Sequence, residues 1–281
     1  MPNPISDPLV ENVISEDITD APVRLEATLE GVATVTIDRP HRRNAFDAPT
    51  IAALTEVFET LHGAEGVRVV FLRGEGGHFS AGADLDWMRM AADWSEDDNR
   101  DDAMGLAKML KALDDIPALT VALVEGSAFG GGAGLVAACD IAVATADSRF
   151  AFSEVKLGLT PATISPYVVR AIGPRAATGL FATARVFGAE HALAIGLIEE
   201  VAADAPGIEA IKTRIAGEIM ACAPGAIGDA KQLVKDVAGK AIDHALMEET
   251  ARRIARARVG AEGKEGVAAF LEKRKPAWAA E

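Results

Sequence analysis

Apolar and polar residues alternate at the start of the patterned part of the sequence. Residues 23–29 carry apolar side chains at every second position, and the period of two returns in residues 32–37, after Glu30-Gly31. A period of two indicates half-buried β-strands, and a Gly-containing break between two such runs indicates a hairpin. The pattern therefore predicts two strands joined by a tight turn.

A helical period follows this hairpin. Asp47 is a favourable N-cap with Pro49 just inside, and the apolar residues that come next are spaced for one helix face: Ile51, Leu54, Phe58 and Leu61. Gly63 ends the pattern. A second helical pattern spans about residues 101–113.

Short, nearly continuous apolar runs separate these helices. They lie at residues 69–72 and 119–124, with a weaker run at 141–144. Such runs are typical of strands buried on both faces of a sheet. Strands that alternate with helices predict an α/β fold with a largely parallel sheet.

From about residue 164 the signal is helical. Four amphipathic helices are expected near residues 207–222, 226–238, 242–260 and 264–274. We therefore divide the chain into an acidic flexible tail (1–22), an α/β core (23–206) and a helical C-terminal region (207–281).

Composition narrows the class of protein. The 281 residues are 49% hydrophobic, and 28 basic against 42 acidic residues give a net charge of −14. Nucleic acid is an unexpected partner, because phosphate neutralisation needs clustered Lys and Arg. The N-terminus lacks the pattern of a signal peptide and no run reaches the roughly 18 apolar residues of a membrane span, so we expect a cytoplasmic protein without a membrane partner. Cys139 and Cys222 are interpreted as small core residues.

Three glycine-bearing segments follow predicted strands: GEGGHFSAGADL (74–85), EGSAFGGGAGLVAACDIAVA (125–144) and FAFSEVKLGLTPATISP (150–166). Glycine allows positive φ and close backbone approach, and a glycine run that opens a helix directs free N–H groups at an anion. The third segment carries one acidic residue, Glu154, among apolar and small neighbours.

These segments, with IDRPHRRNAF (37–46) and GVAAFLEKRKP (266–276), resemble the enoyl-CoA hydratase/isomerase (crotonase) family over nearly the whole chain. The resemblance implies a spiral of ββα turns followed by a helical trimerisation region, a homotrimer or hexamer, and an acyl-CoA substrate. It implies no separate cofactor, because coenzyme A enters with the substrate. The longer motifs are most similar to bacterial methylglutaconyl-CoA hydratases.

Carried onto this sequence, the family pattern implies that the N–H groups of Ala83 and Gly131 hold the thioester oxygen as charge gathers on it, and that Glu154 moves protons. The residues that it implies for substrate binding are Asn44, Ala45, Ala81, Asp84, Leu85, Gly134, Phe270 and Lys273. Arg42, Arg43 and Lys273 are candidate cations for the phosphates of coenzyme A.

One position departs from the family pattern. Hydratases of the family commonly use a second glutamate twenty residues before Glu154, where this chain has Gly134. One carboxylate suffices for a Δ3,Δ2-enoyl-CoA isomerase, whereas hydration with one carboxylate requires that group to act twice. We expect a hydratase, with the isomerase as the alternative, and we expect the missing side chain to leave space for a branched or carboxylated acyl group.

Other classes of protein share parts of this pattern. Gly132, Gly134 and Ala137 satisfy a dinucleotide-binding GxGxxA pattern, but Glu154 follows an additional turn instead of ending the next strand. Dienoyl-CoA isomerases resemble the chain but carry acidic residues at the positions of Gly134 and Ala162. A non-catalytic acyl-CoA-binding relative remains open.

Overall fold

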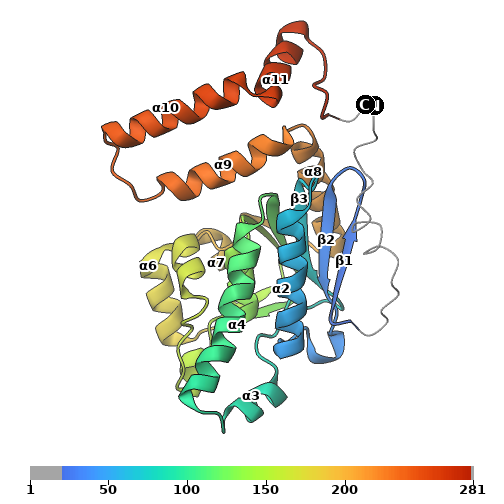
Figure 1. The fold of residues 1–281 in the computed structure, drawn as a ribbon. Coiled ribbons are helices and arrows are strands. Elements are labelled where there is room, and N and C mark those ends of the chain that lie inside the picture. Colours follow the sequence, from blue (N-terminus) through green and yellow to red (C-terminus); the bar gives the residue numbers. More distant parts are fainter. Residues whose placement is uncertain (1–20, 280–281) are drawn as a thin grey trace.

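A computed structural model describes residues 21–279, and the predicted acidic tail lies almost entirely outside the described residues. A six-stranded sheet forms the centre of the fold, with strand order β1-β2-β3-β4-β6-β9 (Figure 1). These strands are β1 (Val23–Ala27), β2 (Val32–Ile37), β3 (Val69–Gly74), β4 (Leu119–Val124), β6 (Ile141–Thr145) and β9 (Glu200–Ala202).

The predicted hairpin and parallel sheet are both confirmed. β1 pairs with β2 in antiparallel register, and every later neighbour in this sheet is parallel. A second sheet of three short strands comprises β5 (Ser127–Phe129), β7 (Arg149–Ala151) and β8 (Phe187–Gly188). The sequence did not predict these three strands or β9, because two or three residues are too few to show a period.

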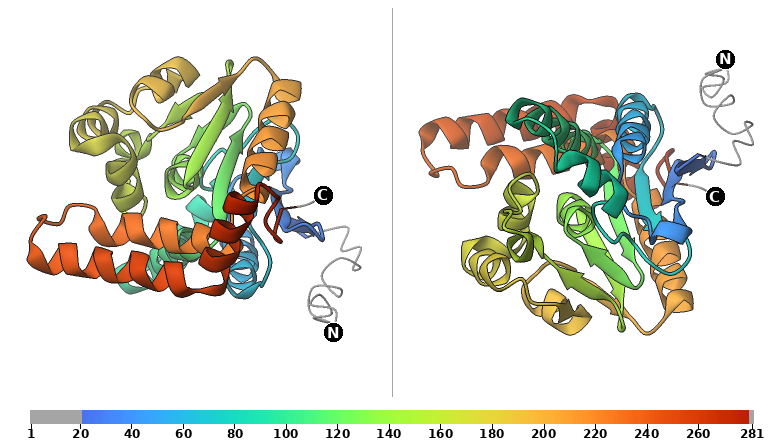
Figure 2. Two further views of the ribbon diagram at one scale, coloured as in Figure 1. Left: turned by 90° about the horizontal axis from the view of Figure 1, so that it is seen from above. Right: turned by 90° about the horizontal axis from the view of Figure 1, so that it is seen from below.

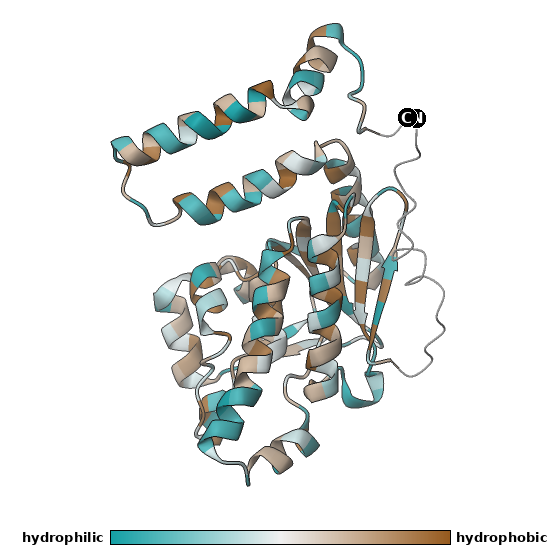
Figure 3. Cartoon of the chain, in the orientation of Figure 1, coloured by the Kyte–Doolittle hydropathy of each residue, from teal (hydrophilic) through white to brown (hydrophobic). Residues whose placement is uncertain are grey.

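Helices cover both faces of the main sheet. The helices and helical turns before residue 200 are η1 (Pro40–Arg42), α2 (Ala48–Gly63), α3 (Leu85–Ala91), α4 (Glu96–Asp115), α5 (Gly131–Ala138), η2 (Glu154–Leu157), α6 (Ser165–Thr183) and α7 (Ala189–Ala194). One face packs against α2, α4 and α5 in a core with Leu54, Phe58 and Leu113. The apolar residues of the strands are visible between these helices in Figure 3.

Helix α8 (Ala205–Met220) covers the other face of the sheet. Its Ile208 and Ile215 are buried against Phe71, Val121 and Val143. The predicted boundary between residues 206 and 207 therefore falls inside a helix of the core. The helices after α8 form a separate group.

Three helices follow as predicted: α9 (Pro224–Val237), α10 (His244–Val259) and α11 (Ala261–Glu272). α9 and α10 run side by side at one end of the molecule, with α9 on the side of the sheet (Figures 1 and 2). Glu262 of α11 accepts hydrogen bonds from two N–H groups at the start of α9, at 2.8 and 3.0 Å. Arg253 of α10 pairs with Asp236 of α9 at 2.6 Å.

The interpretation as a core residue agrees with the packing of Cys139 against the main core, but it is wrong for Cys222. Cys139 is partly exposed, and Cys222 is exposed. Cys222 follows the last turn of α8, where its side chain faces a groove instead of the sheet. Among residues 21–279, no helix has the length and hydropathy needed to cross a bilayer.

Candidate active site

The loops that follow β3 and β4 lie against each other, because the two strands are parallel neighbours and end at the same edge. The N–H of Ser80 donates to the carbonyl of Ser127 at 2.9 Å, and the N–H of Phe129 donates to the carbonyl of Ser80 at 3.0 Å. A Cβ at Gly132 would lie 2.8 Å from that of Ser80. This short ladder joins the first two glycine-bearing segments directly.

Beyond the ladder, glycine brings the two backbones into contact. Gly82 has φ +88°, and a Cβ there would lie 2.8 Å from the carbonyl oxygen of Phe129. Phe46 links the same two loops: its N–H donates to the carbonyl of Gly82, and its carbonyl accepts from the N–H of Asp84, both at 2.7 Å. The Phe46 ring is also the nearest neighbour of Gly131, 3.1 Å from where a Cβ would be.

Amides of both loops are left without a partner in the part of the chain that the structure describes. Within residues 21–279, the N–H groups of Ala83 and Gly131 have no hydrogen-bond acceptor. Gly131 opens α5, and Gly130 before it has φ +50° and ψ −119°, a conformation open to glycine. The positive end of the α5 dipole adds to the attraction of the Gly131 N–H for negative charge. Unpaired N–H groups of this kind are the donors that stabilise an oxyanion.

Glu154 lies beside this pair. It begins η2, directly after β7, and its Oε1 would be 3.3 Å from a Cβ on Gly130. Its other oxygen, Oε2, is buried and has no hydrogen-bond partner. Burial raises the pKa of Glu154, because the ionised carboxylate loses solvation, and one hydrogen bond from its own backbone only partly opposes this. The carboxyl group is thus suited to carrying a proton.

The backbone of η2 fixes where this carboxyl group points. Gly158, with φ +74°, ends the turn, and its N–H donates to the carbonyl of Glu154. The N–H of Leu159 donates to the same carbonyl at 3.1 Å. Glu154 follows β7, a strand of the small sheet. In a dinucleotide-binding fold, the acidic residue would instead follow a strand of the main parallel sheet.

Asn44 supports the site from below. Its side chain is fully buried, accepts from the N–H of Arg39 at 2.8 Å, and donates to the carbonyls of Glu75 and His78 at 2.8 and 2.6 Å. Substrate contact does not fit an amide whose partners are all within the protein. Ala45, 6% exposed, is equally enclosed. These residues position the loops.

Asp84 has a similar supporting role. Its side chain is 4% exposed, caps α3 by accepting from the N–H of Asp86 at 2.9 Å, and pairs with Arg39 at 3.3 Å. Burial would raise the pKa of Asp84, but the N–H groups of the first α3 turn and Arg39 outweigh it and lower the pKa. Asp84 therefore anchors the loop as a carboxylate. Ala81 is partly exposed and Leu85 is 65% exposed, so both remain accessible to a ligand.

Two predicted residues lie elsewhere. Phe270 is in α11 and Lys273 directly follows it. The segment after α11 contacts the beginning of β3, where Arg68 donates to the carbonyl of Trp278 at 3.0 Å. The Ala83 and Gly131 loops follow the opposite ends of the strands. In the single chain, α11, which carries Phe270, lies at the opposite end of the molecule from α3, which follows the Ala83 loop (Figure 1).

The expectation of free space at Gly134 is wrong. A Cβ there would lie 2.8 Å from the Cβ of Ile164 and still closer to its Cγ2. Ile164, at the start of α6, is 2% exposed. Its side chain fills the volume that the missing side chain vacates, so no cavity for a branched acyl group opens at this glycine.

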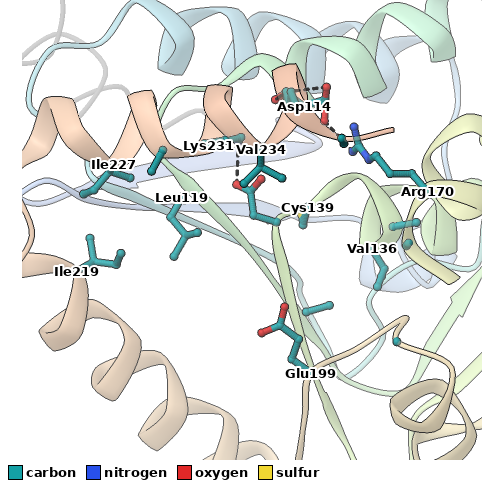
Figure 4. Close-up of a pocket in the computed structure, with 18 of the residues that line it drawn as sticks. Asp114, Leu119, Val136, Cys139, Arg170, Glu199, Ile219, Ile227, Lys231 and Val234 are labelled. Atoms are coloured by element: carbon teal, nitrogen blue, oxygen red, sulfur yellow. Dashed lines mark hydrogen bonds and ion pairs between the residues drawn. The ribbon is translucent and has the colours of Figure 1, made fainter. Parts of the chain in front are cut away.

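A cavity of about 900 Å³ lies away from these residues. It is bounded by the beginning of β4, the end of α5, and helices α8 and α9 (Figure 4). Ion pairs of Lys231 with Asp140 and of Lys235 with Asp114, at 2.7 and 2.8 Å, join α9 to the core there. Its lining does not include Glu154, Ala83 or Gly131, so we do not assign it as the active site.

The sequence did not point to three residues that support the candidate active site. These residues are Arg39, Phe46 and Ile164, which lie within the quoted motifs but carry no feature that marks them as supports of the loops. For Phe46, the available signal was its position as an apolar residue directly after Asn44 and Ala45. Nothing in the sequence marks Ile164 as the neighbour of Gly134.

Comparison with known proteins identifies the family to which the chain belongs. A family model described as enoyl-CoA hydratase/isomerase matches residues 27–281. Enoyl-CoA hydratase ACTT6 of Alternaria alternata is 34% identical over 242 residues, which are 85% of this chain and 78% of that protein.

Solved structures are similar throughout the fold. An enoyl-CoA hydratase from Shewanella pealeana is 39% identical, with a TM-score of 0.87 and coverage of 92% of this chain and 96% of that one. Pseudomonas aeruginosa AtuE is 38% identical, with a TM-score of 0.88 and coverage of 92% and 100%. The predicted fold is confirmed, and the chain belongs to the enoyl-CoA hydratase/isomerase family.

Proposed function

We propose that this protein hydrates a 2-enoyl-CoA thioester, with the N–H groups of Ala83 and Gly131 as the oxyanion hole and Glu154 as the acid and base. The observation that carries the proposal is the pair of unpaired amides beside a partly buried carboxyl group without a side-chain partner. Membership of the family supports the reaction class.

In this proposal Glu154 acts twice. Its carboxylate removes a proton from water while the oxygen of that water bonds to C3 of the enoyl group, and the π electrons move to the thioester oxygen as an enolate. The two N–H groups stabilise that charge, and loss of one such donor costs roughly 3 kcal/mol of transition-state stabilisation. Glu154 then returns the proton to C2, so that one water is added overall. No cofactor is required.

An isomerase is the second candidate, favoured by the packing at Gly134. Residue 134 is a glycine, with Ile164 in the volume of the missing side chain, so this position supplies no second carboxylate. Moving a double bond from C3 to C2 needs only that one group remove a proton from C2 and return one to C4. Glu154 alone can do both.

For the substrate we propose a branched or carboxylated 2-enoyl-CoA, such as 3-methylglutaconyl-CoA. The packing of Ile164 removes the argument that Gly134 leaves space for a branched acyl group. The support that remains is the similarity of the longer motifs to methylglutaconyl-CoA hydratases. Arg43 is a candidate cation for the phosphates of coenzyme A. It is exposed, and its carbonyl accepts from the N–H of Ala81 at 2.9 Å, so it lies next to the site.

We further propose that the protein is a homotrimer or a hexamer of two trimers. Exposed apolar side chains on α9–α11 support association: Val234, Met247, Ile254, Val267, Phe270 and Leu271. In such an assembly, Phe270 and Lys273 can serve a neighbouring active site. The cytoplasmic location stays a prediction.

The test is turnover of crotonyl-, 3-methylglutaconyl- and 3-hexenoyl-CoA, followed by the absorbance of the conjugated thioester. Hydration removes the signal of the first two, and isomerisation creates a signal from the third. Glu154→Gln should lower either rate about 10³-fold, in the range of general acid–base catalysis. Tight binding of all three without turnover would identify a non-catalytic relative and contradict the proposal.

A further inference from the structure

Helix α5 offers two glycine surfaces to the segment that carries Glu154. The N–H of Gly134 donates to the carbonyl of Gly130 at 3.0 Å, so the two glycines are one turn apart, about 6 Å along the axis. Gly130 faces Oε1 of Glu154, and Gly134 faces the side chain of Ile164. Residues 154 and 164 begin and end one loop, and each packs on one of these glycines.

Ile164 is closely held in this position. It is 2% exposed and belongs to the main apolar core, and its side chain occupies the place that a Cβ on Gly134 would take. A side chain at 134 and the isoleucine cannot occupy the same volume. The pair therefore holds an apolar group about one helical turn along α5 from Gly130, the glycine that the Glu154 carboxyl group faces.

We propose that Ile164, packed against Gly134, is a positioning residue that limits the access of bulk water to the Glu154 carboxyl group and fixes the loop that carries it. The inference rests on the proposed function only for its catalytic consequence. The inference concerns how well the Glu154 carboxyl group is shielded from solvent, and the pKa of this group can be measured without turnover.

Charged neighbours do not explain that environment. Helix α5 carries no titratable side chain. On α6, Arg170 lies 5.4 Å from the centre of the Tyr167 ring and pairs with Asp114 at 2.7 Å. On η2 itself, Lys156 is exposed. Burial is the main cause of the raised pKa of Glu154, so removal of the apolar cover should lower it.

The experiment is an infrared titration of the protonated carboxyl band, assigned to Glu154 by its absence in Glu154→Gln. Wild type is compared with Ile164→Val and Ile164→Ala, and with Ile208→Ala as control. Ile208 is 0% exposed but belongs to the core on the other face of the sheet. We expect the midpoint of Glu154 to fall by about one pH unit in Ile164→Ala and by less in Ile164→Val. The control should leave it unchanged.

A midpoint that stays at the wild-type value in both Ile164 variants would overturn the inference. So would an equal shift in Ile208→Ala, since that would report general loosening of the fold. If Ile164→Ala does not fold, Ile164→Val decides. Failure of the proposed function would be seen separately. If Glu154→Gln keeps its activity, Glu154 is not the catalyst, but the titration of Glu154 in the wild type and the Ile164 variants still tests the inference. In an active enzyme, the acidic limb of kcat/KM should shift with the titration midpoint.

Discussion

Glu154 combines burial with the lack of a side-chain partner, and this combination has a cost for stability. Its pKa in the folded protein lies above the ordinary value of 4.5, so the folded state holds the proton more tightly than the unfolded state. Stability is therefore lost as pH rises from about 4.5 through the folded pKa, and it is not regained at higher pH.

Glu154→Gln removes this cost, so the variant should be more stable than wild type at pH 8, with a smaller difference at pH 5. Denaturant unfolding at the two pH values measures both differences. If the stability difference is the same at both pH values, Glu154 does not have a raised pKa.

Asn44 has the reverse role, as a polar group that is fully satisfied. Asn44→Ala leaves the amide of Arg39 and two carbonyls without their partner, so the free energy of unfolding should fall by about 2–4 kcal/mol. Asn99→Ala is the control, because Asn99 is exposed and accessible to water. Its effect should stay within about 0.5 kcal/mol. Equal losses in the two variants would contradict the supporting role of Asn44.

At the scale of elements, the contact of α5 with the Phe46 segment determines where the Gly131 amide lies. Gly131→Ala places a Cβ 3.1 Å from the Phe46 ring, so either the ring or the helix must move. Because small displacements of a catalytic group are costly, kcat/KM should fall by about tenfold or more. Steady-state kinetics provide the measurement.

Gly179→Ala in α6 is the matched control for this change. A Cβ at Gly179 meets no atom within 4 Å, so the helix should gain up to about 1 kcal/mol of stability with unchanged kinetics. If both variants have wild-type kcat/KM, the spacing between Phe46 and α5 does not position the amide.

Sequence predicted the elements better where apolar residues mark them. The strands at 69–72 and 119–124 and the four C-terminal helices were found within a few residues. Helix α4 begins at Glu96, five residues before its predicted start, because residues 96–100 are all polar and only the Ser95 capping box signals the start.

The site was predictable only in part for a physical reason. The glycines and Glu154 belong to local motifs, whereas the packing of Ile164 into the Gly134 position depends on how two separate helices meet. Whether a glycine leaves space is decided by its neighbours in three dimensions. Likewise, Asn44 has a polar side chain, and only the fold shows that its partners are internal.

At the scale of the whole molecule, the helices α9–α11 leave apolar surface exposed in a single chain. Val234 is 65% exposed and Phe270 is 82% exposed. A homotrimer predicts a native mass three times that of the 29.3 kDa chain, and a hexamer six times. Sedimentation equilibrium measures it.

Val234→Asp combined with Phe270→Asp should shift this equilibrium toward smaller species, since charge in an apolar interface is costly. Leu29→Asp is the control, because Leu29 is 79% exposed and lies in the turn between β1 and β2, outside the helices α9–α11. A monomeric wild-type protein would contradict the proposed assembly.

The central claim is that two main-chain amides and one carboxyl group act on a single thioester. A crystal structure of Glu154→Gln with bound crotonyl-CoA tests it most directly. The account predicts that the thioester oxygen lies about 3 Å from the nitrogens of both Ala83 and Gly131, with residue 154 facing C2 and C3. A thioester oxygen that contacts neither nitrogen would contradict the account.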